Sequence, residues 1–155
     1  MLAGCKSCKY SLSGINIPPD VKNISVAFFN NQAQLVNPNL SQKFTELLKD
    51  KFIRETSLAL VPENGDFKVS GSIVDYKTEI AATNSATGSA RNRFVMRVKV
   101  VFESPKHKEM NFTEEFSNFQ EFNATDNFQS LENALSEEVS RQIVQAIFNR
   151  IALKW

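Results

Sequence analysis

Cysteine is almost absent from this sequence, and the little there is lies at one end. The 155 residues contain two cysteines, Cys5 and Cys8, both within the first eight positions. The rest of the chain therefore has no thiol for a disulfide scaffold or a cysteine metal site. The single histidine, His107, cannot supply the several imidazoles of a typical zinc site.

Other signals of common functions are missing as well. No run approaches 18 apolar residues, so the sequence predicts no transmembrane helix. The net charge of +1 provides no overall field for nucleic acid, and we expect no nucleic-acid partner. The chain has no Gly-x-Ser-x-Gly, His-Glu-x-x-His or phosphate-loop motif. We therefore expect no enzymatic activity, no catalytic residues, no metal and no cofactor.

Phenylalanine is what the sequence has in quantity. It contains 13 Phe but only five Gly, in a chain that is 42% hydrophobic and 23% charged. These overall fractions are ordinary for a globular protein, and the length suits one domain. So many rings indicate a thick core between layers of secondary structure.

The first residues resemble the end of a lipoprotein signal. Leu2-Ala3-Gly4-Cys5 has the small residues and the cysteine of a bacterial lipobox, in which the thiol accepts a diacylglycerol. A complete signal needs an apolar stretch of about 7–15 residues before the cleavage site. Only four residues precede Cys5, so the match is either the end of a truncated signal or chance. We interpret residues 1–20 as a truncated signal and flexible tether with Cys5 as the lipid attachment site, and residues 21–155 as one domain.

Cys8 completes a Cys-x-x-Cys pair with Cys5. A redox pair is expected in a thioredoxin-like βαβ context, whereas this pair precedes a linker containing Pro18 and Pro19. Haem attachment requires His where this chain has Lys9. We interpret Cys8 as an incidental second thiol.

Hydrophobic periodicity predicts four strands and two helices. Alternation indicates strands over residues 21–29, 67–80, 92–103 and 110–119. Apolar residues at spacings of three and four indicate a helix that opens at residues 37–41 and ends near Thr56. A second helix is predicted from Asp126, with Gln129 completing a capping box, almost to Trp155. Residues 81–90 are small and polar, which predicts a long hairpin tip.

This order, β-α-β-β-β-α, predicts the α+β class. Consecutive strands joined by turns favour a four-stranded, mostly antiparallel sheet, and the two helices are expected to pack on one of its faces. The result is a two-layer sandwich whose other face is polar.

Several stretches together resemble the LptE family of lipopolysaccharide-assembly lipoproteins, in its Bacteroidetes form. They are residues 10–14 (Tyr-Ser-Leu-Ser-Gly), 36–41, 50–52, 71–73, 92–94, 98–100, 116–119 and the helical segment 131–155. The resemblance implies a lipid-anchored protein on the periplasmic side of the outer membrane. It also implies a partner, an LptD-type β-barrel that the protein plugs, and a role in lipopolysaccharide transport.

A basic stripe lies on one face of the strand predicted over residues 92–103. It consists of Arg93, Arg97 and Lys99, with Arg91 just before the strand. These side chains can bind lipopolysaccharide phosphates or contact the barrel wall. Alternatively, they form a solvated face that pairs with Glu114 or Glu115 on the next strand.

Two other functions fit the same residues. A periplasmic lipid-binding or carrier lipoprotein would hold its ligand between sheet and helices, in a cavity lined by Phe side chains. An adaptor without a membrane link would leave Cys5 unmodified.

Overall fold

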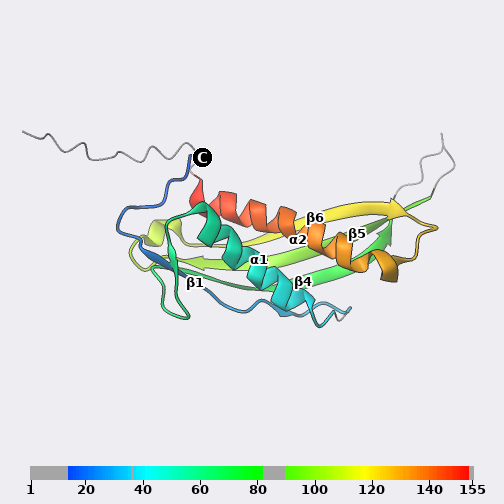
Figure 1. The fold of residues 1–155 in the computed structure, drawn as a ribbon, viewed down its shortest axis with the longest axis horizontal. Helices are drawn as coiled ribbons and strands as arrows, with labels where there is room; N and C mark the ends of the chain where they lie inside the picture. Colours follow the sequence, from blue (N-terminus) through cyan, green and yellow to red (C-terminus); the bar gives the residue numbers. More distant parts are fainter. Residues whose placement is uncertain (1–13, 36, 82–89, 154–155) are drawn as a thin grey trace, which may run out of the picture.

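The fold has two layers, a six-stranded sheet and two helices that lie side by side on one of its faces (Figure 1). The computed structural model describes residues 14–35, 37–81 and 90–153. The helices are α1 (Leu40–Glu55) and α2 (Phe128–Ala152). The strands are β1 (Asn23–Val26), β2 (Asn30–Asn31), β3 (Ala59–Leu60), β4 (Phe67–Ile80), β5 (Arg91–Glu103) and β6 (Phe112–Asn123), and a 3-10 turn, η1 (Lys108–Met110), precedes β6.

The sheet is mixed. Its strands follow the order β3-β1-β4-β5-β6, and β2 pairs with β4 beyond the end of β1. Strands β4, β5 and β6 form a long antiparallel meander, whereas β1 runs parallel to both β3 and β4. The two edges therefore differ, because β3 is two residues long and β6 is twelve.

The α+β class and the two helices on one face are as predicted, but the four-strand sheet was wrong. Asn30–Asn31 follows the strand predicted over residues 21–29 and forms β2 against Ser72 and Ile73. Ala59–Leu60 lies between the predicted first helix and the strand predicted from residue 67, and it forms β3. Two residues cannot show an alternating pattern. Their pairing depends on neighbouring strands that meet them only in the folded chain.

A β-bulge in β4 decides which of its side chains face the helices. Ile73 pairs with Val98, Asp75 pairs with Arg97, and the register shifts between them. The extra residue, Val74, reverses the alternation. Ahead of the bulge, odd-numbered residues face the helices; beyond it, Tyr76 does, and Asp75 turns to the open face of the sheet.

The core lies between the sheet and the helices and combines aliphatic side chains with aromatic rings that contact one another. Ring centroids are 5.2 Å apart for Phe29 and Phe44, 4.9 Å for Phe67 and Phe102, and 4.9 Å for Tyr76 and Phe94. Helix α1 contacts β1, β2 and β3, while α2 contacts β5 and β6. The Phe side chains thus fill the space between the two layers.

The element ends differ from the prediction in detail. The N-cap of α2 is Asn127, whose side chain accepts a hydrogen bond from the Gln129 N–H, so the predicted cap at Asp126 was wrong. Strand β6 continues to Asn123, beyond the predicted residue 119.

The chain enters the fold beside the end of α2. Ile15 bridges to Leu153, and the Asn16 N–H donates to the Ala152 carbonyl at 2.7 Å. The β4–β5 hairpin points to the opposite end of the molecule (Figure 1). Cys5, Cys8 and residues 82–89 of the predicted hairpin tip lie outside the described residues.

Candidate functional site

The four residues of the predicted basic stripe lie together on the open face of the sheet. They occupy alternate positions of β5, whose intervening residues, such as Phe94 and Val98, are fully buried under the helices. Strand β5 lies between β4 and β6, so both neighbours can place side chains beside the stripe.

The arginines of the stripe already have carboxylate partners. Arg97 contacts Asp75 at 2.9 Å and Glu115 at 3.6 Å. Glu121 lies 3.2 Å from Arg93 and 3.6 Å from Arg91. The open face therefore carries paired basic and acidic side chains, and it is not a free basic surface.

The pairing shifts the protonation equilibria of its central members. Partial burial raises the pKa of Asp75, but hydrogen bonds from Arg97 and Lys77 outweigh it and hold the pKa below its usual value. The same bond from Arg97 to Asp75, with Glu115 nearby, raises the pKa of Arg97. These charges persist across the physiological pH range.

Lys99 and Phe119 are two residues of this face that could make further contacts with a bound group. Lys99 has no ion-pair partner among the residues that the structure describes. Phe119 is 45% exposed, and the Arg93 guanidinium lies over its ring at 4.0 Å from the centroid. Lys99 lies opposite Glu115, and Phe119 lies opposite Val95, four residues farther along the β5–β6 pair, so an anionic group and an apolar group would bind at separate positions.

Of the two glutamates considered as partners of the stripe, only Glu115 contacts it. Glu114 lies on the helix face, where its carboxylate accepts from Arg150 Nε at 2.9 Å. The guanidinium of Arg150 also covers the Phe112 ring, at 4.3 Å from its centroid. This contact fixes the end of α2 to the start of β6.

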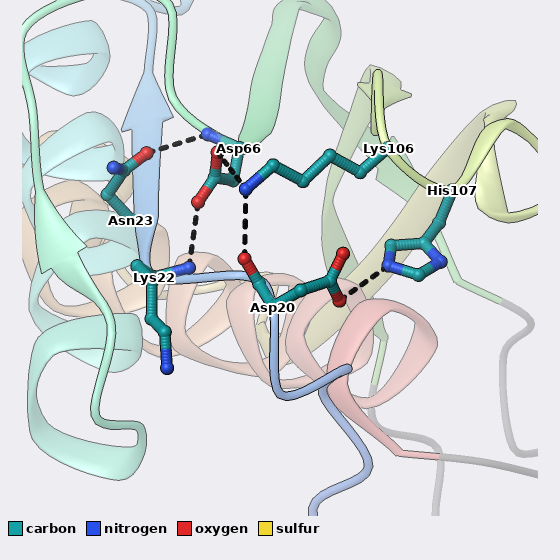
Figure 2. A network of polar contacts seen from close by, with 6 residues as sticks. All are labelled: Asp20, Lys22, Asn23, Asp66, Lys106 and His107. Atoms are coloured by element: carbon teal, nitrogen blue, oxygen red, sulfur yellow. Dashed lines mark hydrogen bonds and ion pairs between the residues drawn. The ribbon is translucent and has the colours of Figure 1, made fainter.

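A second polar cluster, centred on Asp66, holds the entering segment (Figure 2). The Asp66 carboxylate accepts from the Lys22 backbone N–H at 2.8 Å and lies 3.1 Å from Lys106 Nζ. The Asp66 N–H donates to Asn23 Oδ1 at 2.7 Å. The hydrogen bond from Lys22 and the contact with Lys106 lower the pKa of Asp66.

His107 joins this cluster from the β5–β6 turn (Figure 2). Its Nε2 lies 2.8 Å from Asp20 Oδ1, and its Nδ1 lies 3.4 Å from Glu109. The hydrogen bond with Asp20 raises the pKa of His107 above its usual value, and the bond with His107 lowers that of Asp20. This cluster could not be predicted from the sequence, because its members are up to 87 residues apart.

Two hollows lie on the surface of the described part of the chain. One, of about 420 Å³, lies where the entering chain meets the end of α2, with Pro18, Met110 and Ile151 in its wall. The other, of about 440 Å³, lies between the helices and is lined by charged side chains such as Lys51 and Arg141. Neither separates the sheet from the helices.

No helix in the described ranges is both long and apolar enough to cross a bilayer. Within the same ranges, no three His, Cys, Asp or Glu side chains are grouped so that they could hold a metal ion.

Comparison with known proteins places these features in a family. The family model LptE, described as lipopolysaccharide-assembly, matches residues 21–151. No curated protein matches the chain. The fold is similar to several solved structures of low sequence identity.

Three solved structures illustrate the likeness. A putative neuraminyllactose-binding hemagglutinin homolog from Helicobacter pylori has a TM-score of 0.57 at 8% identity and covers 92% of this chain and 89% of its own. An uncharacterized lipoprotein B from Nitrosomonas europaea has a TM-score of 0.51 at 15% identity, with 82% and 79% covered. A minor lipoprotein from Acinetobacter baumannii has a TM-score of 0.50 at 12% identity, with 87% and 98% covered. At these identities the likeness concerns the fold.

Proposed function

Because this chain belongs to the LptE family of lipopolysaccharide-assembly proteins, we propose that it is a non-enzymatic lipoprotein of the outer membrane. In this role it binds and plugs an LptD-type β-barrel and supports the passage of lipopolysaccharide. The observation that carries the proposal is the family match, which spans nearly the whole folded domain.

The structure supports this function through its packing and ion pairs. The aromatic core is closely packed, and the open face is held by ion pairs across three strands. A plug must keep its shape inside a barrel, and only a very large barrel would enclose a body of this size, whose radius of gyration is about 15 Å.

Co-purification tests the proposal. A tagged full-length chain extracted from native membranes in mild detergent is expected to bring a β-barrel protein in near-equal amount. An unrelated lipoprotein with the same tag serves as control. Recovery of the chain with no barrel protein would overturn the proposal.

Attachment through Cys5 is part of the same proposal. Mass spectrometry of the protein isolated from its native membrane is expected to show a diacylglycerol-modified N-terminus at Cys5. Cys5→Ser should abolish the modification, while Cys8→Ser should leave it intact. An unmodified N-terminus in the native protein would contradict the anchor without affecting the barrel interaction.

Direct contact with lipopolysaccharide is proposed at the open face, through Lys99. Its ammonium has no ion-pair partner within the described part of the chain, so binding a phosphate there breaks no existing pair. Lys99→Ala should weaken binding of purified lipopolysaccharide several-fold, whereas Lys108→Ala, in the η1 turn, should not. Equal affinities would remove Lys99 from the site.

The rival function, a lipid carrier, receives less support. A carrier would hold its ligand between sheet and helices, where the rings of Phe29, Phe44, Phe67 and Phe102 are fully or almost fully buried and in contact. Recovery of stoichiometric lipid from the purified chain would favour the carrier over the plug.

A further inference from the structure

Strand β6 forms a long free edge of the sheet. It pairs with β5 along its whole length, from Phe112 opposite Phe102 to Asn123 opposite Arg91, with no register shift. No other strand in the described part of the chain pairs with it. Twelve residues at about 3.3 Å each give an edge of roughly 40 Å.

Two hydrogen bonds identify which backbone groups of β6 point away from the sheet. The Ala124 N–H donates inward to the Ala90 carbonyl at 3.2 Å, whereas the Phe119 N–H donates to the side chain of Asn118 at 2.8 Å. In an antiparallel pair, inward and outward residues alternate. The outward set in β6 is therefore Thr113, Glu115, Ser117, Phe119, Glu121 and Asn123, whose side chains lie on the open face.

This edge has only part of the usual protection against strand pairing. Proteins blunt exposed edges with short strands, charged side chains (especially lysine), proline or bulges. The opposite edge, β3, is two residues long and is followed closely by Pro62. Strand β6 is long and regular and contains neither proline nor lysine, and its charged residues are three glutamates. Such an edge can accept another strand whose charge complements the glutamates.

The side chains of β6 indicate which charges and apolar groups an added strand should carry. The strand carries three glutamates and no basic residue. The Glu115 side chain is 52% exposed, and within the described residues its ion pair is the 3.6 Å contact with Arg97, so it can accept a further cation. Phe119 presents an exposed ring four residues along on the same face. A second β6 would bring more glutamates and no cation, so charge favours a different strand.

We propose that β6 accepts an extended segment of the β-barrel partner as an additional antiparallel strand of the sheet. The segment carries a basic side chain opposite Glu115 and an apolar side chain opposite Phe119. A closed barrel wall has no free edge, so this segment lies outside the wall strands. The inference rests on the proposed function and names the surface that performs it.

Proline at position 117 tests the inference. Ser117→Pro removes one outward N–H and leaves the bonds to β5 in place, because proline is tolerated at sheet edges. Ser117→Ala keeps the N–H and is the matched control. With thermal melting used to confirm that both full-length chains fold, Ser117→Pro should reduce the recovered barrel protein at least tenfold, and Ser117→Ala should not.

Hydrogen exchange on the unmodified complex gives an independent measurement. Amides of Ser117, Glu115 and Glu121 should become protected on complex formation, while the inward amides, already bonded to β5, should change little. Unchanged exchange at the outward amides, with equal barrel recovery by both variants, would overturn the strand addition and leave the proposed function standing.

Two further outcomes would also count against the inference. If the wild-type chain brings no barrel protein, the proposed function fails and the strand addition fails with it. If the isolated chain forms a concentration-dependent dimer in ultracentrifugation that Ser117→Pro abolishes, β6 pairs with a second copy rather than with a barrel segment.

Discussion

Gly71 lies where the core leaves no room for a side chain. A Cβ placed there would lie 2.0 Å from the Lys99 carbonyl oxygen and 2.6 Å from Cε1 of Phe29. The Phe29 ring occupies the space that a side chain of β4 would otherwise fill. Glycine is required here because the β5 backbone and the Phe29 ring lie close to its Cα. It is not required by an unusual backbone conformation.

Gly71→Ala should therefore destabilise the domain. Overpacking of a core typically costs about 1–3 kcal/mol, and part of this clash is with backbone that cannot move without disturbing β5. Urea unfolding followed by circular dichroism would measure the loss. Ser72→Ala, the neighbouring residue of the same strand, is the control and should change the free energy of unfolding little. An equally stable Gly71→Ala chain would contradict the packing described.

At the same scale, the His107–Asp20 contact makes the entering segment sensitive to pH. The pKa of His107 is raised above 6.5, first by the hydrogen bond with Asp20. Its stabilising contribution is therefore complete below pH 6.5 and is lost as the pH rises through the higher, folded-state pKa. The pKa of Asp20 is lowered from 3.8, so its contribution is lost only as the pH falls through that lower value.

Titration of the His107 ring by NMR is the direct measurement. The pKa should exceed 6.5 in the wild type and fall towards 6.5 in Asp20→Asn. Glu109→Gln should lower it less, because Glu109 lies farther away, at 3.4 Å. A His107 pKa at or below 6.5 in the wild type would refute the contact.

For helices and strands, the sequence predicts which residues face the core when apolar and polar residues alternate. It does not predict features that depend on tertiary contacts. The faces of β5 are right because each second residue, from Phe94 to Phe102, is buried. The partner of Arg97 could not be found this way. Simple alternation from Ile73 would place Asp75 in the core, and only the bulge at Val74 turns it towards the arginine.

The same limit explains the missing strands and the pairing of the stripe. Strand β2 has no apolar residue at all and forms only because β4 extends beyond β1. The pairing of Glu121 with Arg91 and Arg93 follows from the β5–β6 register, which depends on the length of the turn between the strands. The residue types alone do not determine which residues of β5 and β6 lie opposite one another.

A contact among three elements offers a test at this scale. Tyr76 of β4 donates to the carboxylate of Glu132 on α2, and Asn37, before α1, donates to the same oxygen at 3.0 Å. Burial, and then this bond, raise the pKa of the Tyr76 hydroxyl above its usual value. The bond joins the starts of both helices to the sheet.

Tyr76→Phe keeps the ring packed on Phe94 but removes the donor, so it should cost about 1–2 kcal/mol of stability. Thermal or urea unfolding would measure it. Asn133→Ala, on the exposed side of the same helix, should have no comparable effect. A Tyr76→Phe chain as stable as the wild type would show that the hydroxyl bond contributes nothing net.

For the whole molecule, the polar cluster at Asp66 predicts two levels of stability. The entering segment, residues 14–22, has one core residue, Val21, and depends on polar contacts such as the 2.9 Å hydrogen bond from Lys106 Nζ to the Asp20 carbonyl, whereas the body is held by its core. Lys106→Ala should increase hydrogen exchange in residues 14–22 and leave α1 and β5 unchanged. Lys108→Ala is the control. A uniform rise in exchange would mean that segment and body open together.

The placement of the entering chain also has a mechanical meaning. A pull on the chain ahead of Gly14 first loads the Ile15–Leu153 bridge at the end of α2, and then the Asp20–His107 contact at the β5–β6 turn. Both points lie before β1, which has only four residues. The force therefore acts first on α2 and on the β4–β5–β6 meander. Strand β1, which follows in the chain, is not pulled away from the sheet.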